Sequence, residues 1–310
     1  MLAIQTENLG KAYRGGWRRA SGPAALRGLN LEVRAGEVFG FLGPNGAGKT
    51  TAIHLLLNLL HPTSGSARLF DRPVAEAAVH RRVGYLPESV NLHPHYHARG
   101  LLGFYAALTG VPVGRRAARI AEVLGLVKLT DAGDKPITKY SKGMLQRLGF
   151  AQALLHDPDL LILDEPTSNL DPVGRKEFRD ILVELKRAGK TVFISSHVLS
   201  EVESVCDRVA ILQRGELKRV GTIAELSASR SARLVLPALP ADLVEPVAET
   251  GAELVIRKGQ VAIRCPDEPT RLRVEALLRE RAVTDFRAEG ETQSLEDIFF
   301  SALQSPPPPL

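Results

Sequence analysis

The first two thirds of the chain alternate between short apolar runs and longer segments in which apolar residues recur at helical spacing. The short runs are bounded by glycine, proline or polar residues and predict buried strands at 38–42, 83–86, 160–163 and 191–195. The longer segments predict helices at 50–60, 98–108, 116–126, 142–155 and 173–187. Short apolar strands separated by helices are typical of a parallel sheet covered on both faces, so the pattern predicts an α/β fold.

The alternation weakens at 225–230, a polar stretch rich in serine and alanine that we take as a domain boundary. Beyond it the pattern predicts strands at 232–236, 253–257, 260–264 and 284–288, and helices at 241–249, 270–280 and 295–303. The order βαββαβ favours a ferredoxin-like split βαβ sandwich. We therefore expect a large domain over 1–228, a small α+β domain over 229–304 and a disordered proline-rich tail at 305–310.

Composition excludes some classes of protein but identifies none. Hydrophobic residues make up 44% of the chain and charged residues 24%, as in an ordinary globular protein. No apolar run approaches the roughly 18 residues that span a bilayer, and we expect no signal peptide. Two cysteines, Cys206 and Cys265, indicate a reducing cytoplasm without a disulfide framework. The net charge of +5 is too modest and too evenly spread to indicate a partner.

A glycine-rich segment lies between the strand predicted at 38–42 and the helix that follows it. It fits the pattern G-x-x-x-x-G-K-[ST] and reads Gly43-Pro44-Asn45-Gly46-Ala47-Gly48-Lys49-Thr50-Thr51. Glycines allow backbone N–H groups to surround phosphates, and the N-terminus of the next helix attracts the same anions. Lys49 can reach β- and γ-phosphates, and the Thr50 hydroxyl can bind Mg²⁺. This strand–loop–helix setting favours a phosphate site over a chance glycine-rich turn.

Two acidic residues, Asp164 and Glu165, directly follow the strand predicted at 160–163. Ligands of open α/β sheets gather at the carboxyl ends of the strands. We expect Asp164 to hold the Mg²⁺ shell and Glu165 to polarise the attacking water as the general base. Adjacent acids after a strand are usually a solvated turn or a helix cap, but the phosphate loop upstream favours the catalytic interpretation.

Four more motifs occur in order around these two, and together they resemble the ABC ATPases. The segment Tyr140-Ser141-Lys142-Gly143-Met144-Leu145-Gln146-Arg147 resembles their LSGGQ signature, in a variant often seen in export-type subunits. Ser168–Asp171 looks like their D-loop, His197 looks like their switch histidine, and Gly84–Glu88 occupies the place of their Q-loop. The match covers about residues 1–225, and an ordered set of motifs is far more specific than one motif.

The resemblance implies a RecA-like P-loop NTPase core with an antiparallel β subdomain and a helical signature subdomain at about 91–155. Ser141 opens a predicted helix whose positive end suits an anion, although the serine could be a simple N-cap. In the family that anion is the γ-phosphate of ATP held by the other subunit, close to the N–H of Gly143. Asp171 would sense the opposite site, or serve as a turn acid. His197 would hydrogen-bond the γ-phosphate and orient the water, although a lone histidine after a strand is more often structural.

Some positions depart from the family pattern or leave alternatives open. Glu88 stands where the family usually has glutamine, and its carboxylate can still ligate Mg²⁺. Tyr13 fits the aromatic position that stacks on adenine, although Trp17 could compete for it. The alternating histidines of 93–97 could share one face as zinc ligands do, but no cysteine or paired acid completes the set. We favour a polar contact loop there.

The sequence therefore predicts the ATP-binding and ATP-hydrolysing subunit of an ABC transporter, working with Mg²⁺ and powering export through a separate integral membrane permease. It would act as a homodimer, or a heterodimer with a similar subunit, at the inner face of the cell membrane. The alternative is a non-transport ABC ATPase acting on nucleic acid or the ribosome. Repair ATPases need a coiled coil or zinc insertion before the signature, and ribosome factors normally carry two cassettes, so we expect no nucleic-acid partner. A small-molecule kinase does not explain Ser141 or His197.

Overall fold

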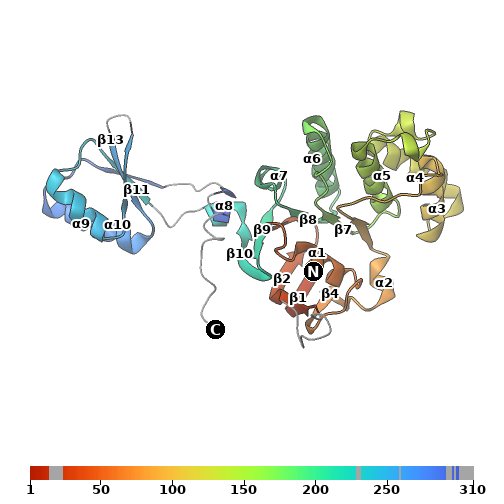
Figure 1. The fold of residues 1–310 in the computed structure, drawn as a ribbon, viewed down its shortest axis with the longest axis horizontal. Coiled ribbons are helices and arrows are strands. Elements are labelled where there is room, and N and C mark those ends of the chain that lie inside the picture. The colour runs from red at the N-terminus through yellow and green to blue at the C-terminus, as the bar shows by residue number, and fades with distance from the viewer. Residues whose placement is uncertain (14–23, 228–231, 258–259, 291–294, 297, 300–310) are drawn as a thin grey trace. The chain divides into compact units, whose positions relative to one another are not determined.

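The computed structural model describes residues 1–13, 24–227, 232–257, 260–290, 295–296 and 298–299 (Figure 1). The chain divides into two compact units, Met1–Ile223 and a second unit that begins at Ala224, and each is described by itself. Trp17, the tail at 305–310 and most of the helix predicted at 295–303 lie outside the described residues.

A six-stranded sheet forms the centre of the first unit. Its strands are, in spatial order, β10 (Glu216–Thr222), β9 (Arg208–Gln213), β3 (Val38–Leu42), β8 (Thr191–Ser196), β7 (Leu160–Asp164) and β6 (Val83–Leu86). All neighbouring pairs are parallel except β10 with β9. Every residue of β3, β7 and β8 is buried, which explains why the stretches 38–42, 160–163 and 192–194 do not alternate between apolar and polar residues.

A second, antiparallel sheet is built mainly from the N-terminal part of the chain. Its strands are, in spatial order, β2 (Ala24–Arg34), β1 (Leu2–Ala12), β4 (Ser64–Leu69) and β5 (Arg72–Pro73). Helix α1 (Lys49–Leu56) contacts strands of both sheets, so their inner faces share one hydrophobic core. Along β2 buried and exposed residues alternate from Leu29 to Arg34, as expected for a strand with one face in water.

The remaining helices of this unit follow the strands of the central sheet or form a separate helical region (Figure 1). They are α2 (Ala77–His80), α3 (Ala98–Leu108), α4 (Val113–Leu126), η1 (Thr130–Ala132), η2 (Ile137–Lys139), α5 (Lys142–Leu154), α6 (Pro172–Arg187) and α7 (Leu199–Glu203). The short helix α8 (Ile223–Ser227) lies at the junction of the two units. Helices α3, α4 and α5 pack on one another around buried leucines, so the segment 98–154 is a helical subdomain.

In its described residues, the second unit combines one antiparallel sheet with the helices α9 and α10 and a short 3₁₀ helix. Its elements are β11 (Ala232–Leu236), η3 (Ala241–Leu243), α9 (Val244–Glu249), β12 (Glu253–Arg257), β13 (Gln260–Cys265), α10 (Glu268–Glu280) and β14 (Arg287–Gly290). The strand order is β12-β13-β11-β14, a split βαβ arrangement. Buried residues of the strands and of both helices, including Leu234, Val247, Ile263 and Leu278, form its core.

The predicted boundaries differ from the structure at several elements. The helix predicted at 50–60 ends at Leu56, because Asn58 adopts a left-handed conformation with a φ of 54° that a helix cannot continue through. The helix predicted at 116–126 begins at Val113, directly after Pro112. The strand predicted at 284–288 lies instead at Arg287–Gly290, where it pairs with β11.

Gly84 on β6 provides a test of how closely the helical subdomain packs against the central sheet. A Cβ atom at Gly84 would lie 2.2 Å from the carbonyl oxygen of Ala153 on α5. The variant Gly84→Ala must move α5 away from β6, so we expect its free energy of unfolding to fall by about 1–3 kcal/mol. The midpoint of urea unfolding, followed by far-ultraviolet circular dichroism, measures this change.

The matched control is Gly114→Ala in the first turn of α4, where an added Cβ meets no atom within 4 Å. Alanine is a better helix former than glycine, so this variant should be as stable as the parent chain or slightly more stable. Equal urea midpoints for the two variants would contradict the close α5–β6 packing.

Candidate functional site

The glycine-rich loop 43–48 connects the central strand β3 to helix α1. The loop lies so close to its neighbours that side chains are excluded at two positions. A Cβ atom at Gly43 would lie 2.5 Å from the carbonyl oxygen of Leu212, and one at Gly48 would lie 2.4 Å from that of Ala25. Glycine is therefore required by space at both ends of the loop.

Left-handed backbone shapes the same loop. Gly46 and Gly48 have φ angles of 77° and 107°, values that L side chains rarely adopt. The N–H of Ala47 donates to the carbonyl oxygen of Pro44 at 3.1 Å and closes the turn. The N–H groups in the first turn of α1 have no acceptor within the helix, so the helix presents its positive end beside this turn.

A pocket of about 450 Å³ opens beside the loop. Its walls are Ala25, Pro44, Asn45, Gly46, Ala47, Gly48, Lys49, Thr50, Thr51, Glu88, Glu165 and His197. Every one of these residues except Ala25 was singled out from the sequence as a candidate. The fold thus brings residues that are more than 100 positions apart in the chain to one cavity.

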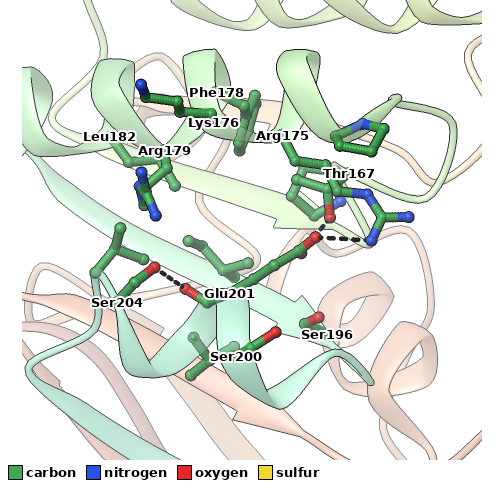
Figure 2. A pocket seen from close by; sticks show the side chains of 15 residues that line it. Thr167, Arg175, Lys176, Phe178, Arg179, Leu182, Ser196, Ser200, Glu201 and Ser204 are labelled. Carbon is green, nitrogen blue, oxygen red and sulfur yellow. Dashed lines mark hydrogen bonds and ion pairs between the residues drawn. The ribbon is translucent and has the colours of Figure 1, made fainter.

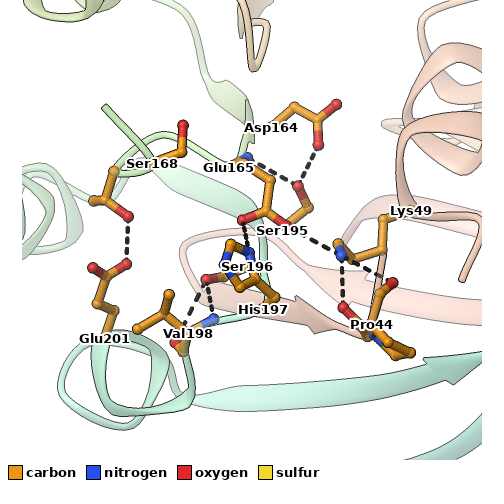
Figure 3. Close-up of polar contacts among 12 residues, drawn as sticks. Pro44, Lys49, Asp164, Glu165, Ser168, Ser195, Ser196, His197, Val198 and Glu201 are labelled. Atoms are coloured by element: carbon orange, nitrogen blue, oxygen red, sulfur yellow. Dashed lines mark hydrogen bonds and ion pairs between the residues drawn. The ribbon is translucent and has the colours of Figure 1, made fainter. Parts of the chain in front are cut away.

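Lys49 lines this pocket, and its side chain is only 6% exposed. Its ammonium donates hydrogen bonds to the carbonyl oxygens of Gly43 at 2.6 Å and Pro44 at 3.4 Å (Figure 3). The same Nζ lies 3.1 Å from Oε1 of Glu165, whose side chain is 9% exposed. Oε1 forms no hydrogen bond of good geometry with any described residue, so the contact is an ion pair.

Glu165 follows the last residue of β7 in a left-handed conformation, with a φ of 47°. This conformation costs a residue other than glycine roughly 1–2 kcal/mol. Two hydrogen bonds hold it, because the N–H of Glu165 donates to both the carbonyl oxygen (3.2 Å) and the hydroxyl (3.1 Å) of Ser195. Oε2 lies 2.8 Å from Nδ1 of His197, so the carboxylate is held between Lys49 and this imidazole (Figure 3).

Asp164 is 1% exposed and accepts hydrogen bonds from two hydroxyl groups. Thr50 Oγ1 donates to its Oδ2 at 2.9 Å, and Ser195 Oγ donates to its Oδ1. The described residues offer this buried carboxylate no ion-pair partner, which is the environment that favours a bound cation. Hydroxyl and carboxylate oxygens from Thr50, Asp164 and Glu88 are the hard ligands that Mg²⁺ prefers.

The electrostatic field of these acids reaches a neighbouring tyrosine. The pKa of Tyr85 is raised to about 12, first by burial and then by the negative charges of Asp164 and Glu88. The negative charges of Glu88 and Asp164 thus act on the same tyrosine. In the described parts of the chain, the histidines of 93–97 do not come together in a group of three or more His, Cys, Asp or Glu side chains.

Six candidates are not among the walls of this pocket: Gly43 and Asp164, described above, and Tyr13, Ser141, Gly143 and Asp171. The hydroxyl of Tyr13 lies 3.4 Å from Thr51 Oγ1, and Tyr13 itself is exposed to solvent. Ser141 caps α5 by accepting a hydrogen bond from an N–H of the first turn at 3.2 Å. Asp171 caps α6 in the same way at 2.8 Å, and Gly143 lies in the first turn of α5. Within one chain, Ser141 and Asp171 are thus N-caps.

Sequence reasoning missed Ser195, which contacts both acids of the site. The parallel pairing of β7 with β8 places Asp164 opposite Ser195, so the serine reaches the carboxylate across the sheet. Two polar residues, Ser195 and Ser196, follow the apolar run 192–194 and end β8 next to His197. This change from apolar to polar residues at the end of a buried strand is the sequence feature that could have identified Ser195 as a site residue.

Comparison with protein families places this site in a known context. A family model described as "ABC transporter" matches residues 26–168. An uncharacterised ABC transporter ATP-binding protein of Nostoc sp. is 46% identical over 230 residues, which cover 74% of this chain and 69% of the relative. The uncharacterised ABC transporter ATP-binding protein YxlF of Bacillus subtilis is 36% identical over 309 residues, covering 98% of this chain and all of the relative. The bacitracin transport ATP-binding protein BcrA of Bacillus licheniformis is 42% identical over 69% of this chain and 68% of its own length.

Solved structures show the same fold. An ATP-binding subunit of an ABC transporter superposes with a TM-score of 0.64 at 27% identity, over 72% of this chain and 91% of its own. A dimeric ATP-binding cassette in a post-hydrolysis state with ADP and Pi superposes with a TM-score of 0.65 at 24% identity. The match covers 71% of this chain and 98% of the cassette. The chain therefore belongs to the ATP-binding proteins of ABC transporters, which are ATPases, and the predicted P-loop fold class is confirmed. None of the helices described combines the length and apolar character needed to cross a bilayer.

Ser195 allows a test of how the two acids are held. The variant Ser195→Ala removes the only hydroxyl that donates to Asp164 Oδ1 among the residues described, and leaves this buried oxygen without a donor. An unsatisfied buried acceptor costs about 1–3 kcal/mol, so the free energy of unfolding should fall by that amount. Urea unfolding measures the change.

The matched control is Ser66→Ala, which removes an exposed serine hydroxyl on β4. Its effect should stay within about 0.5 kcal/mol. A urea midpoint for Ser195→Ala equal to that of the control would show that Ser195 does not support Asp164.

Proposed function

We propose that this chain hydrolyses ATP to power export of a substrate through a separate integral membrane permease. The observation that supports the proposal most strongly is the single pocket in which the phosphate loop, Lys49, Glu165 and His197 meet. Export is supported by the names of relatives: bacitracin transport in Bacillus licheniformis, Nod factor export in Burkholderia orbicola and fluoroquinolones export in Mycobacterium tuberculosis. These names concern different cargoes, so the cargo of this chain is left open.

Within one chain, each group of the pocket has a proposed task. The loop N–H groups and Lys49 bind the β- and γ-phosphates, with Lys49 leaving its ion pair to Glu165 as it does so. Glu165 then polarises the attacking water as the general base, and His197 hydrogen-bonds the γ-phosphate and orients that water. Tyr13, which contacts Thr51 at the rim, stacks on the adenine.

Mg²⁺ is the metal that suits the oxygen ligands of this site. Thr50 and Asp164, already hydrogen-bonded at 2.9 Å, would hold it together with Glu88. Bound there, the ion neutralises negative charge on the phosphates of ATP. The glutamate at position 88 adds a negative charge that the usual glutamine of the family lacks.

A second copy, or a similar subunit, is proposed to complete each site. Ser141 is exposed at the positive N-terminus of α5, a helix of 13 residues, and does not line the pocket of its own chain. In a head-to-tail pair, Ser141 and Gly143 of one chain would face the γ-phosphate held by Lys49 of the other, with Asp171 close to the opposite site. The dimeric cassette with ADP and Pi supports pairing of this fold.

Attachment to the membrane would come through the permease. The helical subdomain would pass the closing motion to that partner, which would place the chain in the cytoplasm at the inner face of the cell membrane. We propose residues 229–304 as a separate accessory domain, supported by the division of the chain at Ala224. No nucleic-acid partner is part of this proposal.

The variant Glu165→Gln tests the proposed function. It keeps the size of the side chain but removes the base, so ATP turnover should fall by about 10²–10⁴-fold while ATP still binds. With hydrolysis stopped, the ATP-bound pair should accumulate as a dimer in sedimentation velocity runs. Steady-state phosphate release measures the turnover.

The control is Glu184→Gln, which changes an exposed glutamate on α6. It should hydrolyse ATP at the rate of the parent chain and remain in the same association state. Turnover by Glu165→Gln at the control's rate would remove Glu165 from the role of base, and a persistent monomer would contradict the shared site.

A further inference from the structure

Two segments of the first unit carry the groups next to the proposed water. One contains Glu165 and runs from the end of β7 to α6, and the other contains His197 and runs from the end of β8 to α7. Only two residues separate β8 from α7, so the position of His197 depends directly on where α7 is anchored. The contacts of α7 therefore decide how the imidazole faces the site.

Apolar contacts fix one side of α7 to the central sheet. Leu199 and Val202 lie one helical turn apart and are 9% and 1% exposed. Val202 packs directly over β3, where a Cβ atom at Gly40 would lie 2.5 Å from its Cγ1. The absence of a side chain at Gly40 thus allows α7 to approach the sheet closely.

A carboxylate fixes the other side of α7. Glu201 Oε2 accepts a short hydrogen bond from the hydroxyl of Thr167, and Oε1 lies 3.5 Å from a guanidinium nitrogen of Arg175 on α6. Figure 2 shows this side chain reaching from α7 across a pocket of about 280 Å³ toward both partners. Thr167 is 8% exposed, so its hydroxyl is bonded where little water competes.

Thr167 stands two positions after Glu165 and begins the turn that leads to α6. The N–H of Leu170 donates to the Thr167 carbonyl oxygen at 3.0 Å, and Asp171 then caps α6. The hydrogen bond from Thr167 to Glu201 thus joins α7, the helix that follows His197, to the Glu165 segment, which includes the D-loop at 168–171. It is separate from the direct His197–Glu165 contact inside the catalytic pocket.

We propose that Glu201 is a positioning residue for ATP hydrolysis, an inference that rests on the proposed function and deepens it. His197 must turn from Glu165 to reach a γ-phosphate, so the direct contact between the two segments opens at that moment. The Glu201–Thr167 hydrogen bond involves neither the Glu165 carboxylate nor the His197 imidazole. It therefore keeps the two segments at the same relative position while the imidazole turns. Glu201 therefore acts through the placement of His197, without touching ATP.

The test is steady-state kinetics of Glu201→Ala, with ATP affinity measured separately by calorimetry. We expect kcat to fall at least tenfold, while KM and the dissociation constant of ATP change less than twofold. Glu201→Gln keeps an acceptor for the Thr167 hydroxyl and should recover most of the lost kcat. Thr167→Val removes the donor, so it should reproduce the loss, and combining it with Glu201→Ala should lower kcat no further.

A His197→Ala background separates positioning from general support of the fold. If Glu201 acts by placing His197, then adding Glu201→Ala to His197→Ala should leave the residual turnover unchanged. The control Glu203→Ala, an exposed glutamate on the same helix, should retain the kcat of the parent chain.

Three outcomes would overturn the proposal: a parental kcat for Glu201→Ala, a further large loss in the His197→Ala background, or a loss of ATP affinity equal to the loss of kcat. Failure of the proposed function is distinguishable from these, because the unmodified chain would then show no phosphate release above that of Glu165→Gln.

Discussion

The ion pair between Lys49 and Glu165 is the interaction on which the site depends. Both side chains are more than 90% buried, and a buried charge is strongly destabilising unless it is paired and hydrogen-bonded. Two backbone carbonyl oxygens, from Gly43 and Pro44, satisfy the remaining donors of the ammonium. In the proposed function, phosphates entering the pocket would compete with Glu165 for Lys49, and the carboxylate released in this way would become available to the attacking water.

The topology of the central sheet makes this pair possible. β3 ends at the phosphate loop and β8 ends at His197, while β7, which lies beside β8, ends at the two acids. Because these strands are parallel, their carboxyl ends lie at one edge of the sheet, where ligands of open α/β sheets bind. Asp164 and Ser195 face each other through strand register alone, and Glu165 turns out of the strand in a left-handed conformation.

Much of this could be predicted from local pattern. The loop 43–51 was predictable because its glycines, lysine and threonine are consecutive, and β3, β6 and β7 because buried parallel strands are short and apolar. The end of helix α1 at Leu56 could not be predicted, because it depends on the left-handed conformation of Asn58. Ser195 and Glu201 were missed because each acts on a residue about 30 positions away, and only the assembled sheet brings them together.

The most direct test of the central claim is calorimetric titration of ATP with Mg²⁺ into the parent chain, Lys49→Ala and the exposed-lysine control Lys135→Ala. If the phosphates of ATP replace Glu165 as the partner of Lys49, the variant Lys49→Ala loses a charge-assisted hydrogen bond to the nucleotide. The dissociation constant of ATP should then rise at least about tenfold. The control should bind as the parent chain does. An unchanged dissociation constant for Lys49→Ala would contradict the account.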